Sequence, residues 1–122
     1  MKATFEKNQL TGVIVDAAMK VHSALGPGLL ESAYAVCLKH ELIKRGLKVA
    51  SEVPIPVVYD GIRLEAGYKL DLLVEDTVVL ELKAIEALAP IHQAQIISYL
   101  KLSGKPVGLL INFTQSSSKR WH

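Results

Sequence analysis

Two carboxylates and a lysine stand close together in residues 68–83, YKLDLLVEDTVVLELK. If Asp71 and Glu81 lie on neighbouring strands, they offer the oxygen ligands that Mg²⁺ and Mn²⁺ prefer. A cation held there could polarise a phosphodiester and activate a water molecule. Lys83 follows Glu81 by two positions and shares its face of the strand, where it could assist that water. Charge pairing on a solvated sheet face is the structural alternative.

The pairing register of the two strands decides whether these groups meet. If the loop spans residues 75–77, Asp71 lies opposite Glu81, on the same face as Lys83. The other face is then wholly apolar and consists of Leu70, Leu72, Val74, Val78, Leu80 and Leu82. A two-residue turn would instead bury Glu81 and Lys83 among leucines, which costs several kcal/mol for an unpaired ion. Burial therefore favours the three-residue loop and a convergent acidic site.

Glu31 and Tyr34 are a second candidate pair. They lie three positions apart near the start of an expected helix over residues 29–45, so they share a face. A glutamate in the first helical turn also suits the helix dipole without any other role. Tyr34 falls on the apolar stripe of the helix, where it could be a core residue with its hydroxyl at the rim.

Gln95 and Tyr99 form a third candidate pair. They lie four positions apart on an expected helix over residues 91–102, on the face that also carries His92. A face that only packed against a core would carry apolar residues, so this one indicates a polar edge beside a site. For His92 itself, a helix-capping or surface position is favoured over metal ligation.

Helices and strands of a small α/β protein are expected to position these groups. The spacing of apolar residues predicts helices at 8–25, 29–45 and 91–102. Strands are expected at residues 49–59, 62–64, 68–74, 78–83 and 107–113. Asp60-Gly61 is a strong hairpin signal between two of them. The order ααββββαβ predicts one mixed β-sheet flanked by helices.

Composition sets the class of protein. The 122 residues suit one domain, with a flexible tail expected at 113–122. Half of the residues are apolar and the mean hydropathy is +0.28, which favours a sheet buried on both faces or a homodimer. The sequence shows no membrane-spanning run and no signal peptide, and its single cysteine excludes an internal disulfide, so a cytoplasmic protein is expected. A net charge of +2 permits a nucleic-acid partner without requiring one.

Several of these motifs together resemble a known family. Residues 26–34, GPGLLESAY, contain the pattern G-x-x-E-x-x-Y as Gly28, Glu31 and Tyr34. The segments GYKLDLLVEDTVVLELKAIEAL, PIHQAQIISYLKLSG and VGLLINF follow in matching order. Over residues 9–113 the chain resembles the GxxExxY family, prokaryotic proteins of the PD-(D/E)xK nuclease superfamily. The resemblance implies a restriction-endonuclease-like core.

The resemblance also implies roles for individual residues. Asp71 and Glu81 would bind one Mg²⁺ or Mn²⁺ ion, with the backbone carbonyl of Leu82 as a further ligand. Lys83 would assist the attacking water. Glu31 would hold a water ligand of the metal or a second metal.

Other parts of the motif carry over with one departure. Gln95 and Tyr99 match a Q-x-x-x-Y motif that orients the site and the nucleic-acid backbone in related nucleases. Leu70 stands where the superfamily's name has proline, a position that provides no ligand. The implied activity is Mg²⁺-dependent hydrolysis of nucleic acid, with DNA as the expected substrate. The alternatives are a non-catalytic protein- or nucleic-acid-binding module and a dimeric junction resolvase.

Overall fold

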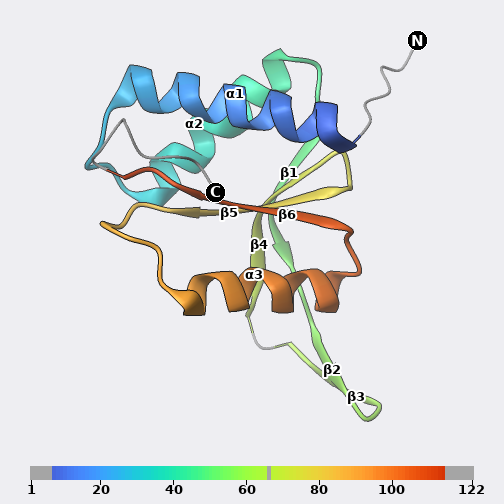
Figure 1. Ribbon diagram of the computed structural model, residues 1–122. Coiled ribbons are helices and arrows are strands. Elements are labelled where there is room, and N and C mark those ends of the chain that lie inside the picture. The colour runs from blue at the N-terminus through green and yellow to red at the C-terminus, as the bar shows by residue number, and fades with distance from the viewer. Residues whose placement is uncertain (1–6, 66, 115–122) are drawn as a thin grey trace.

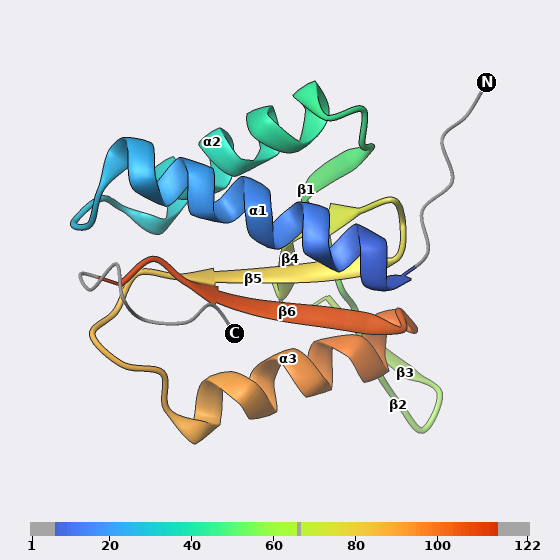
Figure 2. The same cartoon turned by 45° about the horizontal axis from the view of Figure 1, so that its top comes forward.

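A four-stranded mixed sheet between two helical layers is the main feature of the computed structural model, which describes residues 7–65 and 67–114. The elements are α1 (Lys7–Leu25), α2 (Glu31–Lys44), β1 (Val49–Pro54), β2 (Val57–Tyr59), β3 (Ile62–Leu64), β4 (Lys69–Val74), β5 (Val78–Lys83), α3 (Pro90–Ser103) and β6 (Val107–Asn112). Strand order is β1-β4-β5-β6, with only β5 and β6 parallel. Helices α1 and α2 cover one face and α3 the other (Figures 1 and 2). The expected α/β class with a mixed sheet and flanking helices is confirmed.

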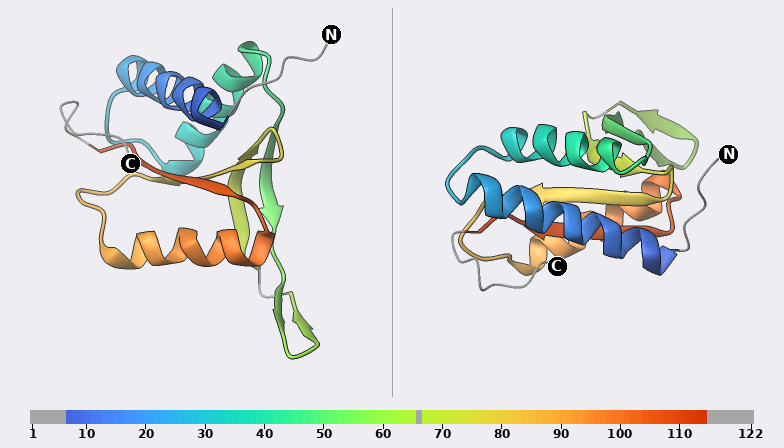
Figure 3. Two further views of the ribbon diagram at one scale, coloured as in Figure 1. Left: turned by 45° about the vertical axis from the view of Figure 1, so that its right-hand side comes forward. Right: turned by 90° about the horizontal axis from the view of Figure 1, so that it is seen from above.

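The expected strand at 49–59 is two strands in two different sheets. β1 joins the main sheet, whereas β2 pairs only with β3 in a separate hairpin. Pro54 and Pro56 lack the N–H that a continuous ladder needs. Ile55 between them donates its N–H to the carbonyl of Tyr68 (2.8 Å), and the chain then leaves the sheet. The order is therefore ααβββββαβ, and the hairpin projects from the body (Figures 1 and 3).

The core lies mainly between the sheet and the helices α1 and α2. On the sheet side it contains the apolar face predicted from the sequence: Leu72, Val74, Val78, Leu80 and Leu82. Leu70 is a correction, because it packs instead in a smaller cluster with Leu73 and Tyr99 beneath α3. The ladder pairs of β4 with β5 end at Leu72–Leu80, so Leu70 is not held opposite Leu82 as expected.

Helix α3 packs closely on β6. A Cβ atom on Gly108 would lie 2.9 Å from the Cδ1 atom of Ile96, so the absence of a side chain permits this approach. The start of α3 is capped by His92, whose Nδ1 accepts the N–H of Ala89 (2.9 Å), and this confirms the expected capping position. No helix in the described ranges is both long and apolar enough to cross a membrane.

Residues 113 and 114, the first two of the flexible tail expected from the sequence, are held against the rest of the protein. Phe113 is buried and stacks on Tyr34, with ring centroids 4.3 Å apart and planes 5° from parallel. Thr114 is also buried, and the Nε2 atom of His22 donates a hydrogen bond to its carbonyl (2.8 Å). Aromatic stacking and burial hold these two residues in place. The rest of the expected tail, residues 115–122, lies outside the described residues.

Candidate active site

Asp71 and Glu81 meet where the β4–β5 ladder gives way. The predicted register is confirmed by the pairs Leu72–Leu80, Leu73–Val79 and Val74–Val78. Beyond these pairs, the N–H of Leu82 donates to Asp71 Oδ2 (2.8 Å), and the N–H of Asp71 donates to Glu81 Oε1 (3.3 Å). Carboxylate oxygens therefore serve as acceptors for backbone N–H groups at this point. The structure brings the two acids together, as the register analysis expected.

Burial controls the charge of this pair. The Glu81 residue is only 4% exposed, and burial, reinforced by the negative charge of Asp71, raises the pKa of Glu81 to about 7. Burial also raises the pKa of Asp71, against the opposing effects of the Leu82 N–H and of Lys83. Two desolvated carboxylates side by side repel each other, and a bound cation would relieve that repulsion.

Glu31 reaches this region because the preceding loop is anchored by Tyr34. The Tyr34 hydroxyl donates to the carbonyl of Gly26 and accepts the N–H of Leu29. Gly28 has φ +96°, a conformation that favours glycine. The G-x-x-E-x-x-Y pattern thus describes a loop, a helix start and its anchor. Glu31 begins α2, and its charge raises the pKa of both acidic residues on the strands as a smaller effect than burial.

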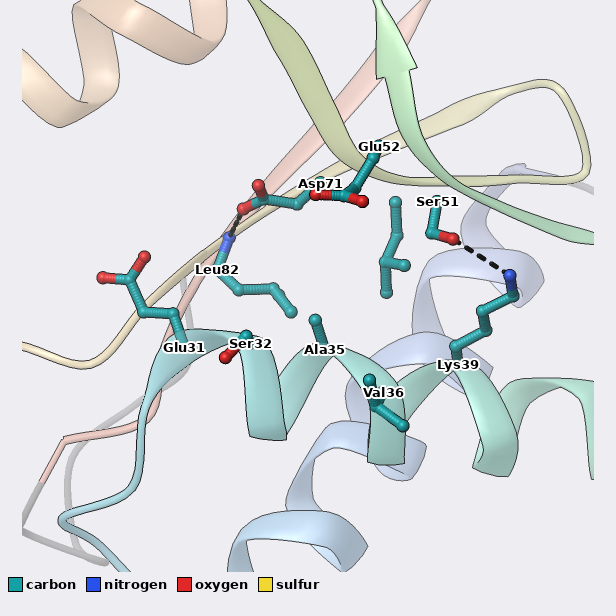
Figure 4. A pocket seen from close by; sticks show the side chains of 10 residues that line it. Glu31, Ser32, Ala35, Val36, Lys39, Ser51, Glu52, Asp71 and Leu82 are labelled. Carbon is teal, nitrogen blue, oxygen red and sulfur yellow. Dashed lines mark hydrogen bonds between the residues drawn. The ribbon is translucent and has the colours of Figure 1, made fainter.

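A cavity of about 380 Å³ opens on the α2 side of the acidic pair (Figure 4). It is lined in part by Glu31, Lys39, Ser51, Glu52, Asp71 and Leu82. In Figure 4 the carboxylate of Asp71 lies between those of Glu31 and Glu52. Glu52 was not among the residues singled out from the sequence. Its φ of +51° is unusual for a non-glycine residue, and such strain is often found at functional sites.

Lys83, Gln95 and Tyr99 lie on the α3 side of the pair. All three line a second cavity of about 630 Å³. Gln95 donates from Nε2 to the Tyr99 hydroxyl (3.0 Å), and burial followed by the charge of Glu81 raises the Tyr99 pKa. Lys83 lowers the pKa of both strand carboxylates and forms no ion pair within the described ranges. Of the six candidate residues, Glu31 therefore lies on the α2 side of the acidic pair, and Lys83, Gln95 and Tyr99 lie on the α3 side.

Asn112 is a positioning residue that the sequence analysis missed. It lies beside Lys83 in the parallel β5–β6 register. Its side chain accepts the N–H of Ile85 (3.0 Å) and donates to the Ile85 carbonyl (2.9 Å), while the N–H of Phe113 donates to the Lys83 carbonyl (2.7 Å). These bonds fix the chain where it leaves β5. A polar residue ending the apolar run VGLLIN was the only signal in the sequence.

The sequence profile described as the PD-(D/E)XK nuclease superfamily matches residues 8–122. The chain belongs to this superfamily. No curated protein and no solved structure matches the chain significantly. Asp71 and Glu81 stand on the adjacent strands β4 and β5, and Lys83 follows Glu81 by two positions.

PD-(D/E)XK nucleases generally use divalent metals, and the donor set of this chain fits one. Within residues 7–65 and 67–114, no three acidic, histidine or cysteine side chains lie close enough to share an ion. Two carboxylates, Asp71 and Glu81, would suit Mg²⁺ if carbonyl and water ligands completed its shell, because Mg²⁺ in proteins keeps several waters. Glu31 is then suited to act through a water rather than as a third direct ligand.

Proposed function

We propose that this protein is a GxxExxY-type nuclease that hydrolyses phosphodiester bonds of DNA with one Mg²⁺ or Mn²⁺ ion. The observation that carries the proposal is the buried acidic pair at the break in the β4–β5 ladder. Lys83 follows Glu81 by two positions, and its charge lowers the pKa of both carboxylates. A buried pair of carboxylates with raised pKa values has no stabilising partner among the described side chains other than the electrostatic effect of Lys83.

Each residue has a defined role in this proposal. Asp71, Glu81 and the carbonyl of Leu82 hold the cation, which when bound supplies Lewis-acid polarisation of the phosphodiester. Lys83 orients the attacking water and offsets developing negative charge. Glu31 holds a water on the α2 side, in the cavity that it shares with Asp71.

Gln95 and Tyr99 orient the substrate backbone from the α3 side. Their mutual hydrogen bond fixes the Gln95 amide beside the cavity that contains Lys83. A fixed polar group reduces the entropy lost when a phosphate binds. The Tyr99 hydroxyl is neutral at physiological pH, as a tyrosine ordinarily is, and burial raises its pKa further.

We also propose a cytoplasmic homodimer. One site of this kind cuts one strand, so cleavage of both strands of a duplex is simplest with two sites related by a two-fold axis. Light scattering of the purified protein measures the oligomeric state directly. A monomer at all concentrations would contradict the dimer and leave single-strand cutting as the activity.

The decisive experiment is a cleavage assay on single-stranded, duplex and branched DNA and on RNA, with Mg²⁺, with Mn²⁺ and with EDTA. Asp71→Asn and Lys83→Ala are each expected to lower cleavage about 100-fold or more. Asp76→Asn is the matched control, since Asp76 is an exposed strand-turn acid paired with Lys105, and it is expected to retain full activity.

The same assay separates the alternatives. Cleavage confined to branched DNA would favour a junction resolvase. Absence of cleavage by folded wild-type protein, combined with intact oligonucleotide binding, would favour a non-catalytic binding module. Equal cleavage by wild type and Asp71→Asn would show that another protein or another site is responsible.

A further inference from the structure

The cavity on the α3 side is larger than the proposed chemistry requires. Its volume of about 630 Å³ lies within the range of about 300–1,000 Å³ typical of small-molecule sites. The lining combines apolar and polar side chains, among them Val57, Tyr68, Lys83, Ile91, Gln95 and Tyr99. This mixture suits a flat aromatic ligand with polar edges, such as a nucleobase.

Tyr68 gives the cavity an aromatic wall on a fixed backbone. Its carbonyl accepts the N–H of Ile55 (2.8 Å), which ties it to the core beside β4. Its ring contacts the ring of Tyr99 at a centroid distance of 6.1 Å and an angle of 55°, yet the residue remains 45% exposed. An aromatic ring that is supported on one side and accessible on another can stack on a base.

Lys83 connects this wall to the proposed chemistry. It lines the cavity, and its charge acts on both carboxylates of the acidic pair. Because a nucleoside is attached directly to the phosphate, a phosphodiester placed at Asp71 and Glu81 has a neighbouring base within reach of the cavity. The base and the scissile phosphate would therefore be bound by adjoining parts of one surface.

We propose that this cavity is a nucleobase subsite, in which one unpaired base beside the scissile phosphate stacks on Tyr68. The inference rests on the proposed nuclease function and names its substrate class. A base within a duplex is covered on both faces by its neighbours and is paired at its edge, so it enters such a cavity only after unstacking. The base beside the scissile phosphate must therefore be unpaired when the bond is cut, either in a single strand or after it has left a duplex stack.

The test measures kcat and KM on a single-stranded oligonucleotide with one mapped cleavage position. Tyr68→Ala is expected to raise KM about 5- to 140-fold, the range for loss of one stacked base, while Tyr68→Phe keeps KM within about threefold of wild type. Tyr59→Ala is the control, because Tyr59 is 74% exposed on the β2–β3 hairpin and does not line the cavity. It is expected to leave KM unchanged.

A second arm changes the substrate and needs no variant that could misfold. An abasic nucleotide next to the cleaved bond should raise KM for the wild type by the same factor as Tyr68→Ala. The two changes together should give no further increase, since both remove one interaction.

The outcomes distinguish this inference from the proposed function. Unchanged KM in Tyr68→Ala, or additive effects of the variant and the abasic substrate, would overturn the subsite. If Asp71→Asn still abolished cleavage in that case, the nuclease function would stand. Wild-type protein that neither cleaves nor binds any oligonucleotide would overturn both.

Discussion

Asp71 and Glu81 each accept a backbone N–H and nevertheless have raised pKa values. Accepted hydrogen bonds favour the ionised form, but burial outweighs them at both residues, and the charge of Asp71 adds to the effect at Glu81. The metal-free protein therefore carries two carboxylates in an unfavourable environment. Active sites often lower the stability of the folded protein, and replacing one carboxylate by a neutral side chain of the same shape should recover part of that stability.

The pH dependence of stability tests this account at Glu81. Its pKa is about 7 in the folded protein, above the ordinary value of 4.5. Between pH 4.5 and 7 the folded protein therefore holds a proton that the unfolded chain has lost, and its stability falls as the pH rises through this range. We expect Glu81→Gln, without metal, to unfold with a free energy higher than wild type by up to about 3 kcal/mol at pH 8. At pH 4.5 the difference should vanish. Urea denaturation in EDTA at both pH values measures it.

A matched acid elsewhere controls for this prediction. Glu65→Gln removes an exposed carboxylate that pairs with Arg63, and its effect on stability should stay within about 0.5 kcal/mol at either pH. A Glu81→Gln variant that is less stable than wild type at pH 8 would contradict the predicted burial cost.

Tyr34 offers a second prediction at the residue scale. Tyr34→Phe keeps the stacking on Phe113 but removes both hydrogen bonds of the hydroxyl to the loop before α2. We expect a loss of about 1–2 kcal/mol in unfolding free energy, with reduced cleavage because Glu31 is held less firmly. Tyr59→Phe, on the exposed hairpin, should change neither quantity. Equal stability of Tyr34→Phe and wild type would show that the hydroxyl contacts do not anchor the loop.

At the scale of elements, the site depends on how β5 is held between its two neighbours. β4 supplies Asp71 on one side, and β6 on the other side supplies Asn112, which fixes the exit of β5. The parallel partner of β5 is β6, which follows α3 in the chain. Helix α3 also packs on β6 at Gly108, so β6 positions both β5 and α3. A substitution in β6 should therefore alter the position of Lys83 even though Lys83 itself is unchanged.

Asn112→Ala tests that dependence. The substitution leaves the N–H and carbonyl of Ile85 without their side-chain partner, which should cost about 1–3 kcal/mol. We expect faster hydrogen exchange at the Ile85 amide and lower kcat in the cleavage assay. Gln93→Ala, an exposed amide on α3, should leave both unchanged. Unaltered exchange at Ile85 in Asn112→Ala would contradict the anchoring role.

The elements that sequence patterns predict well here are those fixed by local burial. The β4–β5 register followed from the cost of burying Glu81 and Lys83, and the structure has the predicted pairs from Leu72–Leu80 to Val74–Val78. The break between β1 and β2 was missed because prolines at 54 and 56 suit both an edge strand and a strand end. Glu52 and Asn112 were missed because they reach the site only when β1 pairs with β4 and β6 pairs with β5. These strands are far apart in the chain, and no local sequence pattern predicts that they pair.

For the whole molecule, the proposed metal is expected to act as a stabilising ligand. Mg²⁺ at 100 times its dissociation constant should raise the unfolding free energy by about 2.7 kcal/mol, because it binds only the folded site. Thermal denaturation should show the increase in wild type and in Asp76→Asn but not in Asp71→Asn, and EDTA should reverse it. An equal Mg²⁺ effect in all three proteins would place the ion elsewhere.

The position of β6 in the chain has a consequence for the newly made protein. Asp71, Glu81 and Lys83 are translated before β6, yet β5 stays an open edge and the Ile85 loop stays unanchored until Asn112 has been added. Parallel pairing of this kind must wait for the whole intervening crossover. A nascent or truncated chain that stops before β6 would thus carry every proposed metal ligand and still lack the strand and the side chain that hold them in place.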